Sequence, residues 1–192
     1  MENAIIIAGG AGFIGSNLVR RLSDGRGKII ILDNFSRGSL SVVQKAAPDQ
    51  NPIIIQCDLS DCKICAKEME KIAVFYRVTE VWHLAANSDI QAGHMDPNLD
   101  LKDTFFTTLN LLTGSKKIGV QTFVFASSSA IYGNLGNARL NEESGPLLPI
   151  SNYGAMKLAS EAIISAACES WLKRSYIFRF PNVVGSPATH GV

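Results

Sequence analysis

The sequence shows no excess of charge of either sign. Eighteen Lys and Arg residues balance 17 Asp and Glu residues over 192 positions, which gives a formal net charge of +1. Proteins that bind nucleic acid or an anionic membrane surface through their overall field carry a strong basic excess. The charge balance therefore offers no support for either class of partner.

The sequence also lacks a long hydrophobic run and a complete set of metal ligands. The N-terminal segment MENAIIIAGG has no basic stretch, and its apolar run stops at glycine, so we expect neither a signal peptide nor a membrane span. The four cysteines, at 57, 62, 65 and 168, are then expected to be reduced thiols in the cytoplasm. Cys62 and Cys65 have the spacing of half a zinc site, but no second CxxC or HxxxH pattern follows, so we predict no metal site.

Short β-branched runs alternate with longer amphipathic segments along the chain. Strands are expected at 4–8, 28–33, 52–57, 80–84, 122–126 and 174–179, and helices at 13–23, 40–46, 61–73, 96–117 and 153–170. This alternation predicts an α/β fold with a doubly wound parallel sheet, the Rossmann fold. Residues 136–150 are expected to form a long loop. We see no linker, so residues 1–192 are expected to form a single domain.

The first predicted strand leads into the glycine-rich segment GGAGFIG at 9–15. Gly10, Gly12 and Gly15 fit the pattern GxGxxG, and Gly9, Gly12 and Gly15 fit GxxGxxG. Such a turn must be tight, must let a pyrophosphate approach the backbone, and must allow close packing of helix on strand. The free N–H groups of a helix that begins at Phe13 would then face the phosphates. The alternative is a glycine-rich turn that binds no ligand.

An acidic residue follows at the end of the second predicted strand. Asp33 lies 18 positions after Gly15 (33 − 15), close to the spacing of a carboxylate that binds the adenosine ribose. Because that carboxylate would repel a 2′-phosphate, we predict NAD rather than NADP as the cofactor. Arg37 lies four residues further on and could soften this preference.

Tyr153 and Lys157 are spaced four residues apart on a predicted helix. Residues at this spacing share one face of a helix, so the Lys157 ammonium is expected near the Tyr153 hydroxyl, where it favours the phenolate. Moving a tyrosine pKa from ~10 to about 7 takes roughly 4 kcal/mol. Lys157 and the positive nicotinamide ring of NAD are expected to supply it. The alternative is a surface helix with an aromatic residue at its start.

Together these features resemble the extended short-chain dehydrogenase/reductase family. Within it the chain is similar to the NAD-dependent epimerase/dehydratase group, and most similar to its UDP-glucose 4-epimerases. The resemblance covers residues 4–192 and rests on several separate motifs. They are GGAGFIG, LDNFSRGS (32–39), CDLSD (57–61), WHLAANSD (82–89), FASSSAIYG (125–133), YGAMK (153–157) and RFPNVVG (179–185).

The resemblance implies a set of NAD contacts. Asp58 and Leu59 would flank the adenine, Ser88 would lie near the nicotinamide end, and Phe180 and Pro181 would lie beside the nicotinamide. The full set of implied cofactor positions is Gly9, Gly12, Phe13, Ile14, Gly15, Asp33, Asn34, Arg37, Asp58, Leu59, Leu84, Ala85, Ala86, Ser88, Thr104, Tyr153, Lys157, Phe180 and Pro181.

The resemblance also implies the catalytic residues. Tyr153 would act as base on the sugar C4 hydroxyl, Lys157 would bind the nicotinamide ribose, and Ser128 would hold the developing oxyanion. Hydride would leave the same carbon for NAD, and return to the opposite face after the keto-sugar turns over. The implied substrate contacts are Ser128, Ser129, Tyr153 and Asn182. Ser129 is the second choice for the active hydroxyl, and either serine could instead cap the backbone at a strand end.

The chain departs from the family pattern in the helix after HLAA. Thr104 stands where the family usually has an asparagine, and Thr107 where it usually has a glycine. A threonine cannot reproduce both halves of an amide, which puts a cofactor contact or proton relay at Thr104 in doubt.

Related reactions are less well supported. The dehydratases of the family carry an Asp-Glu pair after the active hydroxyl and the decarboxylases favour a glutamate, whereas this chain has Ser129 and Ala130 there. A reductase stays open. The family's smaller substrate domain would follow Val192, so the chain is expected to be part of a longer enzyme or a shortened NAD-binding module without full catalysis. The helices at 96–117 and 153–170 would form a four-helix homodimer interface.

Overall fold

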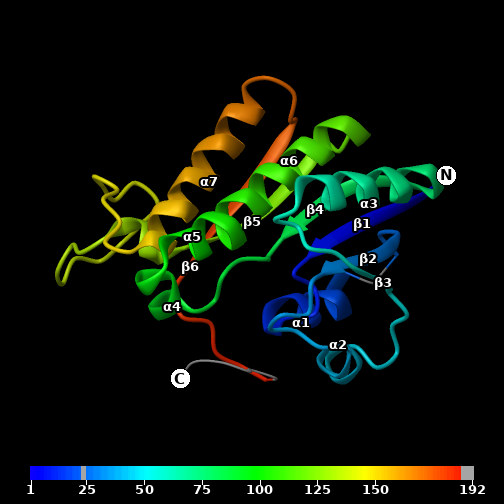
Figure 1. Cartoon of the computed structure of the whole chain (residues 1–192), viewed down its shortest axis with the longest axis horizontal. Coiled ribbons are helices and arrows are strands. Elements are labelled where there is room, and N and C mark those ends of the chain that lie inside the picture. Colours follow the sequence, from blue (N-terminus) through cyan, green and yellow to red (C-terminus); the bar gives the residue numbers. More distant parts are fainter. Residues whose placement is uncertain (23–24, 187–192) are drawn as a thin grey trace.

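The computed structural model describes residues 1–22 and 25–186 and is built around one six-stranded sheet (Figure 1). Its spatial order is β3-β2-β1-β4-β5-β6, and every neighbouring pair is parallel. The strands are β1 (Glu2–Ala8), β2 (Lys28–Asp33), β3 (Ile53–Gln56), β4 (Tyr76–His83), β5 (Thr122–Ser128) and β6 (Arg174–Phe180). The predicted doubly wound α/β fold is confirmed.

Helices cover both faces of the sheet (Figure 1). On one face lie α3 (Cys62–Phe75), α6 (Thr107–Ile118) and α7 (Asn152–Cys168), and on the other lie α1 (Phe13–Leu22) and α2 (Leu40–Ala46). The first predicted helix ends at Leu22, and its last predicted position, 23, lies outside the described residues.

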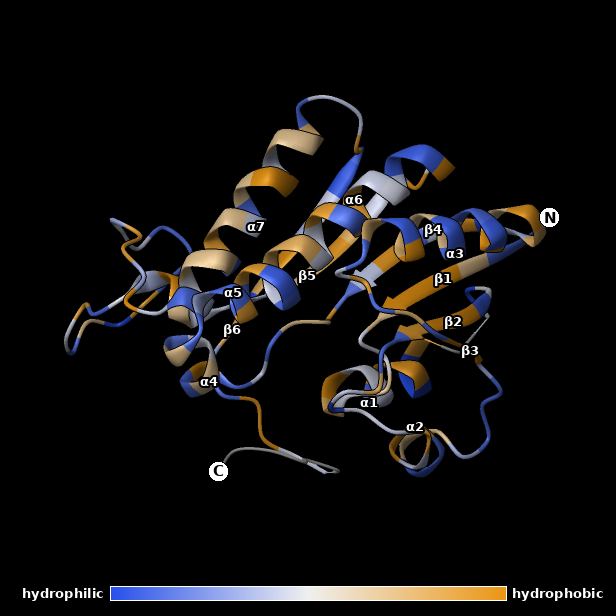
Figure 2. Ribbon diagram, viewed as in Figure 1, coloured by the Kyte–Doolittle hydropathy of each residue, from blue (hydrophilic) through white to orange (hydrophobic). Residues whose placement is uncertain are grey.

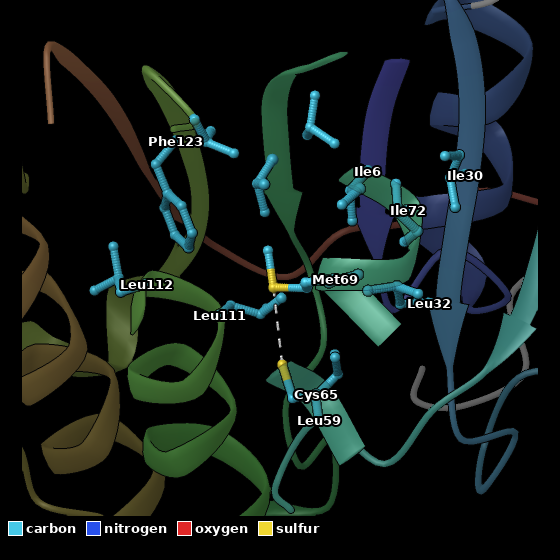
Figure 3. Close-up of a cluster of buried hydrophobic side chains, with 14 of the residues drawn as sticks. Ile6, Ile30, Leu32, Leu59, Cys65, Met69, Ile72, Leu111, Leu112 and Phe123 are labelled. Atoms are coloured by element: carbon cyan, nitrogen blue, oxygen red, sulfur yellow. Dashed lines mark hydrogen bonds between the residues drawn. The ribbon is translucent and has the colours of Figure 1, made fainter. Parts of the chain in front are cut away.

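Strand β1 sends its side chains alternately into two separate cores. Ile6 belongs to the larger core, where it packs with Met69 of α3 and Leu111 of α6 (Figure 3), whereas Ile5 and Ile7 belong to the smaller core beside α1 and α2. All three isoleucines are fully buried, and each buried side chain of this size contributes about 1.5–3 kcal/mol. Coverage of both faces explains why this strand is apolar from Ala4 to Ala8 (Figure 2).

The second face of β6 has no helix over it within the described residues. β6 is an edge strand, and its Tyr176 and Phe178 side chains are 50% and 45% exposed. On its other face, Ile177 packs against the larger core.

The predicted helix at 96–117 consists of three segments. They are α5 (Pro97–Asp100), a π-helical segment η1 (Leu101–Phe106) and α6. The hydroxyls of Thr107 and Thr108 both donate to the Thr104 carbonyl, at 2.9 and 3.0 Å, and so compete for an acceptor of the helical backbone. This is the place where the spacing widens from α to π.

Other elements differ from the prediction in length or were not predicted. β4 begins at Tyr76, directly after α3, instead of at 80. The short helix α4 (Ile90–Met95) and the 3-10 turn η2 (Ser129–Tyr132) were not predicted. The loop predicted at 136–150 is confirmed: between η2 and α7 the chain forms only one isolated bridge, from Gly133 to Leu148. Among the described residues, no helix combines the length and apolarity needed to cross a membrane.

Candidate active site

A cleft of about 470 Å³ opens at the carboxyl ends of β1, β2 and β4. In a doubly wound sheet this is where ligands bind, beside the point at which the strand order reverses. The predicted cofactor positions that line it are Gly9, Gly12, Phe13, Ile14, Gly15, Asp33, Asn34, Arg37, Asp58, Leu59, Leu84, Ala85, Ala86 and Ser88.

Three of the four glycines of the first turn, Gly9, Gly12 and Gly15, differ in why the structure needs a glycine there. Gly9 has a φ of +78°, and a Cβ there would lie 2.6 Å from the Ala85 backbone nitrogen. A Cβ on Gly15 would lie 2.6 Å from the Gly10 Cα and closer still to the Gly9 carbonyl oxygen. A Cβ on Gly12 would meet only the Gly9 carbonyl oxygen, at an ordinary 3.4 Å. The packing of the chain therefore requires Gly9 and Gly15, whereas Gly12 leaves open space toward the cleft.

Asp33 is held in a fixed orientation at the end of β2. One carboxylate oxygen accepts a hydrogen bond from the Ala11 N–H at 2.9 Å, and the other accepts from the Phe35 N–H at 2.8 Å. The side chain is buried to 7% exposure but still lines the cleft. Each oxygen keeps a second lone pair, so the carboxylate can also accept hydrogen bonds from a ribose.

Arg37 lies in the loop after β2 and is paired. Its Nη2 atom lies 3.3 Å from Oδ2 of Asp89, the residue that caps α4, and both side chains are about 40% exposed. Because Asp89 pairs with the Arg37 guanidinium, this cation is less available to a 2′-phosphate, which agrees with a preference for NAD.

Asp58 lies where the resemblance places the adenine. Its Oδ1 accepts from both the backbone N–H and the hydroxyl of Ser60, and its Oδ2 lies 3.8 Å from the Lys102 ammonium. Partial burial acts to raise the pKa of Asp58, but the Ser60 hydrogen bonds and the Lys102 charge outweigh it and lower the pKa. The group is therefore an anchored carboxylate at neutral pH.

The structure brings Ser128, Tyr153 and Lys157 together where β5 ends. Helix α7 begins beside them because the Ser151 hydroxyl accepts from the Gly154 N–H at 3.0 Å. The Ser128 side chain lies close enough to Tyr153 to act on the pKa of its hydroxyl. The Lys157 ammonium is 2% exposed and donates to the Ala126 carbonyl at 2.6 Å.

Within the chain itself, the Lys157 ammonium does not lower the pKa of Tyr153. Burial raises the pKa of Tyr153 above its usual value, the Ser128 hydrogen bond acts to lower it, and the nearby Asp100 raises it further. The Lys157 ammonium lies 5.6 Å from the centre of the Tyr153 ring and is directed at Ala126. Burial lowers the pKa of Lys157 itself to about 7, although the negative charge of Glu161 acts against this.

Ser128 also has the capping role that was the alternative to an active hydroxyl. Its Oγ accepts from the Ala130 N–H at 3.1 Å and so begins η2, of which Ser129 is the first residue. Phe180 pairs in register with Ser128 across β5 and β6. Phe180 is the last residue of β6, Pro181 and Asn182 follow it, and none of the three lines the cleft.

The structure does not place Thr104 in the cleft lining. Its side chain is fully buried, and its hydroxyl accepts from the backbone N–H of Asn87 at 3.2 Å. A direct cofactor contact by Thr104 is therefore not supported, and the residue instead fixes the segment after β4.

Sequence reasoning also missed residues that line the cleft. They are Ser36, Gly38, Cys57, Asn87, Leu99, Asp103 and Thr107. Four of these lie inside the quoted motifs LDNFSRGS, CDLSD and HLAANSD and could have been found there. Leu99, Asp103 and Thr107 lie on α5, η1 and α6, and they reach the cleft through the packing of these segments, which no local pattern indicated.

A parallel sheet in this order, with a glycine-rich turn after β1 and an anchored carboxylate after β2, defines a dinucleotide-binding protein of the Rossmann type. The model of the NAD dependent epimerase/dehydratase family matches residues 5–191, and the chain belongs to that family. The chain is 27% identical over 182 residues to the UDP-glucose 4-epimerase of Azospirillum brasilense, a match that covers 95% of this chain and 49% of that protein.

Solved structures show the same relationship. The Thermus thermophilus UDP-glucose 4-epimerase in complex with NAD has a TM-score of 0.85 and 32% identity, over 98% of this chain and 58% of that one. The Thermotoga maritima UDP-glucose 4-epimerase with UDP-glucose has a TM-score of 0.82 and 31% identity, over 95% of this chain and 56% of that one. The chain thus spans about half the length of the relatives that it matches.

The residues present fit NAD. Gly12 is a glycine that the chain's own packing does not require, at the position where a pyrophosphate approaches the backbone. Asp33 is oriented by two backbone N–H groups and faces the same cleft.

Proposed function

We propose that this chain is the NAD-binding half of a nucleotide-sugar 4-epimerase of the UDP-glucose/UDP-galactose type. The observation that carries the proposal is the grouping of Ser128, Tyr153 and Lys157 at the end of β5, outside the lining of the cleft. The Ser128 side chain acts on the pKa of Tyr153, and the Lys157 ammonium donates to the Ala126 carbonyl. The substrate type rests on the relatives, and the proposal concerns the longer protein to which such a half belongs.

In this proposal Tyr153 removes the proton from the C4 hydroxyl of the sugar, and Ser128 donates a hydrogen bond to the oxygen on which negative charge develops. Bound NAD supplies the hydride acceptor, and its positive ring favours the Tyr153 phenolate. Burial raises the pKa of Tyr153 in the chain itself, so the base requires nearby positive charge to form. Lys157 would bind the nicotinamide ribose of NAD, and its ammonium would add to that charge.

A second candidate is a shortened module that binds NAD without full catalysis. The chain covers 49% and 58% of two of the relatives described above, and epimerisation by this chain would argue against the module. A dehydratase is disfavoured because Ser129 and Ala130 provide no carboxylate after the active hydroxyl. A reductase shares the same cluster and is distinguished by net oxidation of the cofactor.

The proposal is tested by native mass spectrometry of the purified chain, before and after denaturation. We expect a mass increment equal to NAD that is lost on denaturation, because an epimerase regenerates its cofactor and holds it tightly. Epimerisation of UDP-galactose is then measured for the chain and for the full-length protein, with Tyr153→Phe as the inactive control. We expect poor turnover by the chain alone. Full turnover by the Tyr153→Phe protein would refute the proposed base.

We also propose a homodimer in which α6 and α7 of two copies form a four-helix bundle. Leu109 on α6 and Phe106 before it are 39% and 40% exposed, which leaves apolar surface for contact with a second copy. Sedimentation at micromolar concentration tests the interface, and Leu109→Lys is expected to shift a dimer to monomer. A wild-type monomer would count against it. A cytoplasmic location stays a prediction.

A further inference from the structure

One face of α7 lies against the end of β5, at Ala126, Ser127 and Ser128. Tyr153, Lys157 and Glu161 follow one another at intervals of four, so they lie on the same face of the helix. Lys157 Nζ donates to the Ala126 carbonyl at 2.6 Å, and the Ser127 hydroxyl donates to Glu161 Oε1 at 2.5 Å. The Ser128 side chain lies close enough to Tyr153 to act on its pKa. Glu161 therefore continues the row formed by the two residues of the proposed site.

Glu161 is in turn held by Arg179 of β6. Nη2 of Arg179 donates to Glu161 Oε2 at 2.9 Å, and Nε lies 3.2 and 3.3 Å from the two carboxylate oxygens. The side chains are only 9% and 20% exposed for Glu161 and Arg179. A forked contact of this kind fixes both distance and orientation, which a single lysine donor does not.

The Nη1 atom of Arg179 binds the long loop between η2 and α7. Nη1 donates to the Tyr132 hydroxyl at 3.1 Å, and to the Glu142 carbonyl at 2.9 Å. Tyr132 ends η2, the turn that Ser128 begins, and Glu142 lies in the loop between η2 and α7. One guanidinium thus joins α7, β6, η2 and the loop around the proposed site.

We propose that Glu161 and Arg179 are positioning residues for the Ser128, Tyr153 and Lys157 site. Glu161 fixes the strand end that carries Ser128 and keeps a negative charge beside the buried Lys157. Arg179 orients Glu161 and holds the loop against η2. The catalytic meaning of this pair rests on the proposed function, whereas the contacts themselves do not.

The first test is a pH titration of the Lys157 side chain, monitored by NMR. The chain is labelled with carbon-13 and nitrogen-15 lysine, and the Lys157→Arg variant identifies the Lys157 signal. Glu161→Gln removes a negative charge and leaves Arg179 unpaired, so the Lys157 midpoint should fall by about one pH unit or more. Arg179→Met leaves the Glu161 charge uncompensated, so the midpoint should rise. If the ion pair had no effect on the site, the Lys157 midpoint would not fall in Glu161→Gln and rise in Arg179→Met.

The second test is cleavage of the loop by a glutamate-specific protease, which can cut after Glu142 and Glu143. We expect Arg179→Met to raise the rate of cleavage at these two sites at least tenfold, and Arg179→Lys to restore part of the protection. Ile72→Ala, in the core away from this network, is the control for a general loss of stability. Equal cleavage in Arg179→Met and Ile72→Ala would overturn the loop assignment.

The outcomes separate this inference from the proposed function. Normal titration midpoints in both charge variants would refute the positioning role even if the full-length protein is an active epimerase. Shifts of the expected sign would support it even if no epimerisation is found. If Glu161→Gln does not fold, Arg179→Met and Ser127→Ala still decide it, because Ser127→Ala cuts the strand contact and leaves both charges in place.

Discussion

Two alanine substitutions within the glycine turn should have opposite consequences. At position 12, an added methyl group makes only a 3.4 Å contact with the Gly9 carbonyl, so the free energy of unfolding should change by less than about 1 kcal/mol. The same methyl would occupy the space toward the cleft where a pyrophosphate approaches. Overpacking of a tight contact costs about 1–3 kcal/mol, which corresponds to a loss of NAD affinity of about 5- to 150-fold.

At position 15, the added methyl would collide with the backbone of Gly9 and Gly10, which cannot move aside as a flexible side chain could. Gly15→Ala should therefore lose about 3 kcal/mol of stability, at the upper end of the cost of overpacking. Urea denaturation measures the stabilities, and titration calorimetry with NAD measures the affinities. A Gly12→Ala chain that binds NAD like wild type, or a Gly15→Ala chain of unchanged stability, would refute the roles assigned to the two glycines.

Two further substitutions test the carboxylate of Asp33 and the buried amine of Lys157. Asp33→Ala removes a carboxylate that accepts from the Ala11 and Phe35 N–H groups. NAD affinity should fall roughly 10- to 150-fold, while NADP affinity stays the same or rises. Calorimetry with both cofactors checks this, and an equal loss of affinity for both would contradict it. Burial lowers the pKa of Lys157 from 10.5 to about 7 in the folded chain, so between pH 7 and 10 the unfolded state binds more protons and stability should rise with pH. The Lys157→Met chain should lack this rise, which amounts to ~1.4 kcal/mol per pH unit, and parallel wild-type and variant curves from urea denaturation would disprove it.

Local patterns predicted the parts of the protein that local forces determine. The alternation of strands and helices, the glycine turn and the place of Asp33 all follow from short segments, and the structure contains them. The π-helical segment could not be predicted, because six residues are too few to separate its period from that of the helices on either side. The two threonine hydroxyls that donate to the Thr104 carbonyl at its end can be seen only once the side chains are placed.

The parts of the site that depend on burial were less accessible from sequence. The spacing of Tyr153 and Lys157 places them on one face of a helix, but does not give the depth at which that face is buried. That depth raises the pKa of the tyrosine and lowers that of the lysine. The pair of Glu161 and Arg179 was missed because the residues lie on different elements, and only the packing of α7 on β6 brings them together.

The edge position of β6 has a practical consequence for solubility. One row of its backbone N–H and C=O groups has no partner strand in the described residues, and Tyr176 and Phe178 beside it are half exposed. Such an edge is a template on which further strands can add, and it invites precipitation when the chain is concentrated. Purification of the chain at low concentration, or a lysine in place of Phe178, should give the more tractable sample.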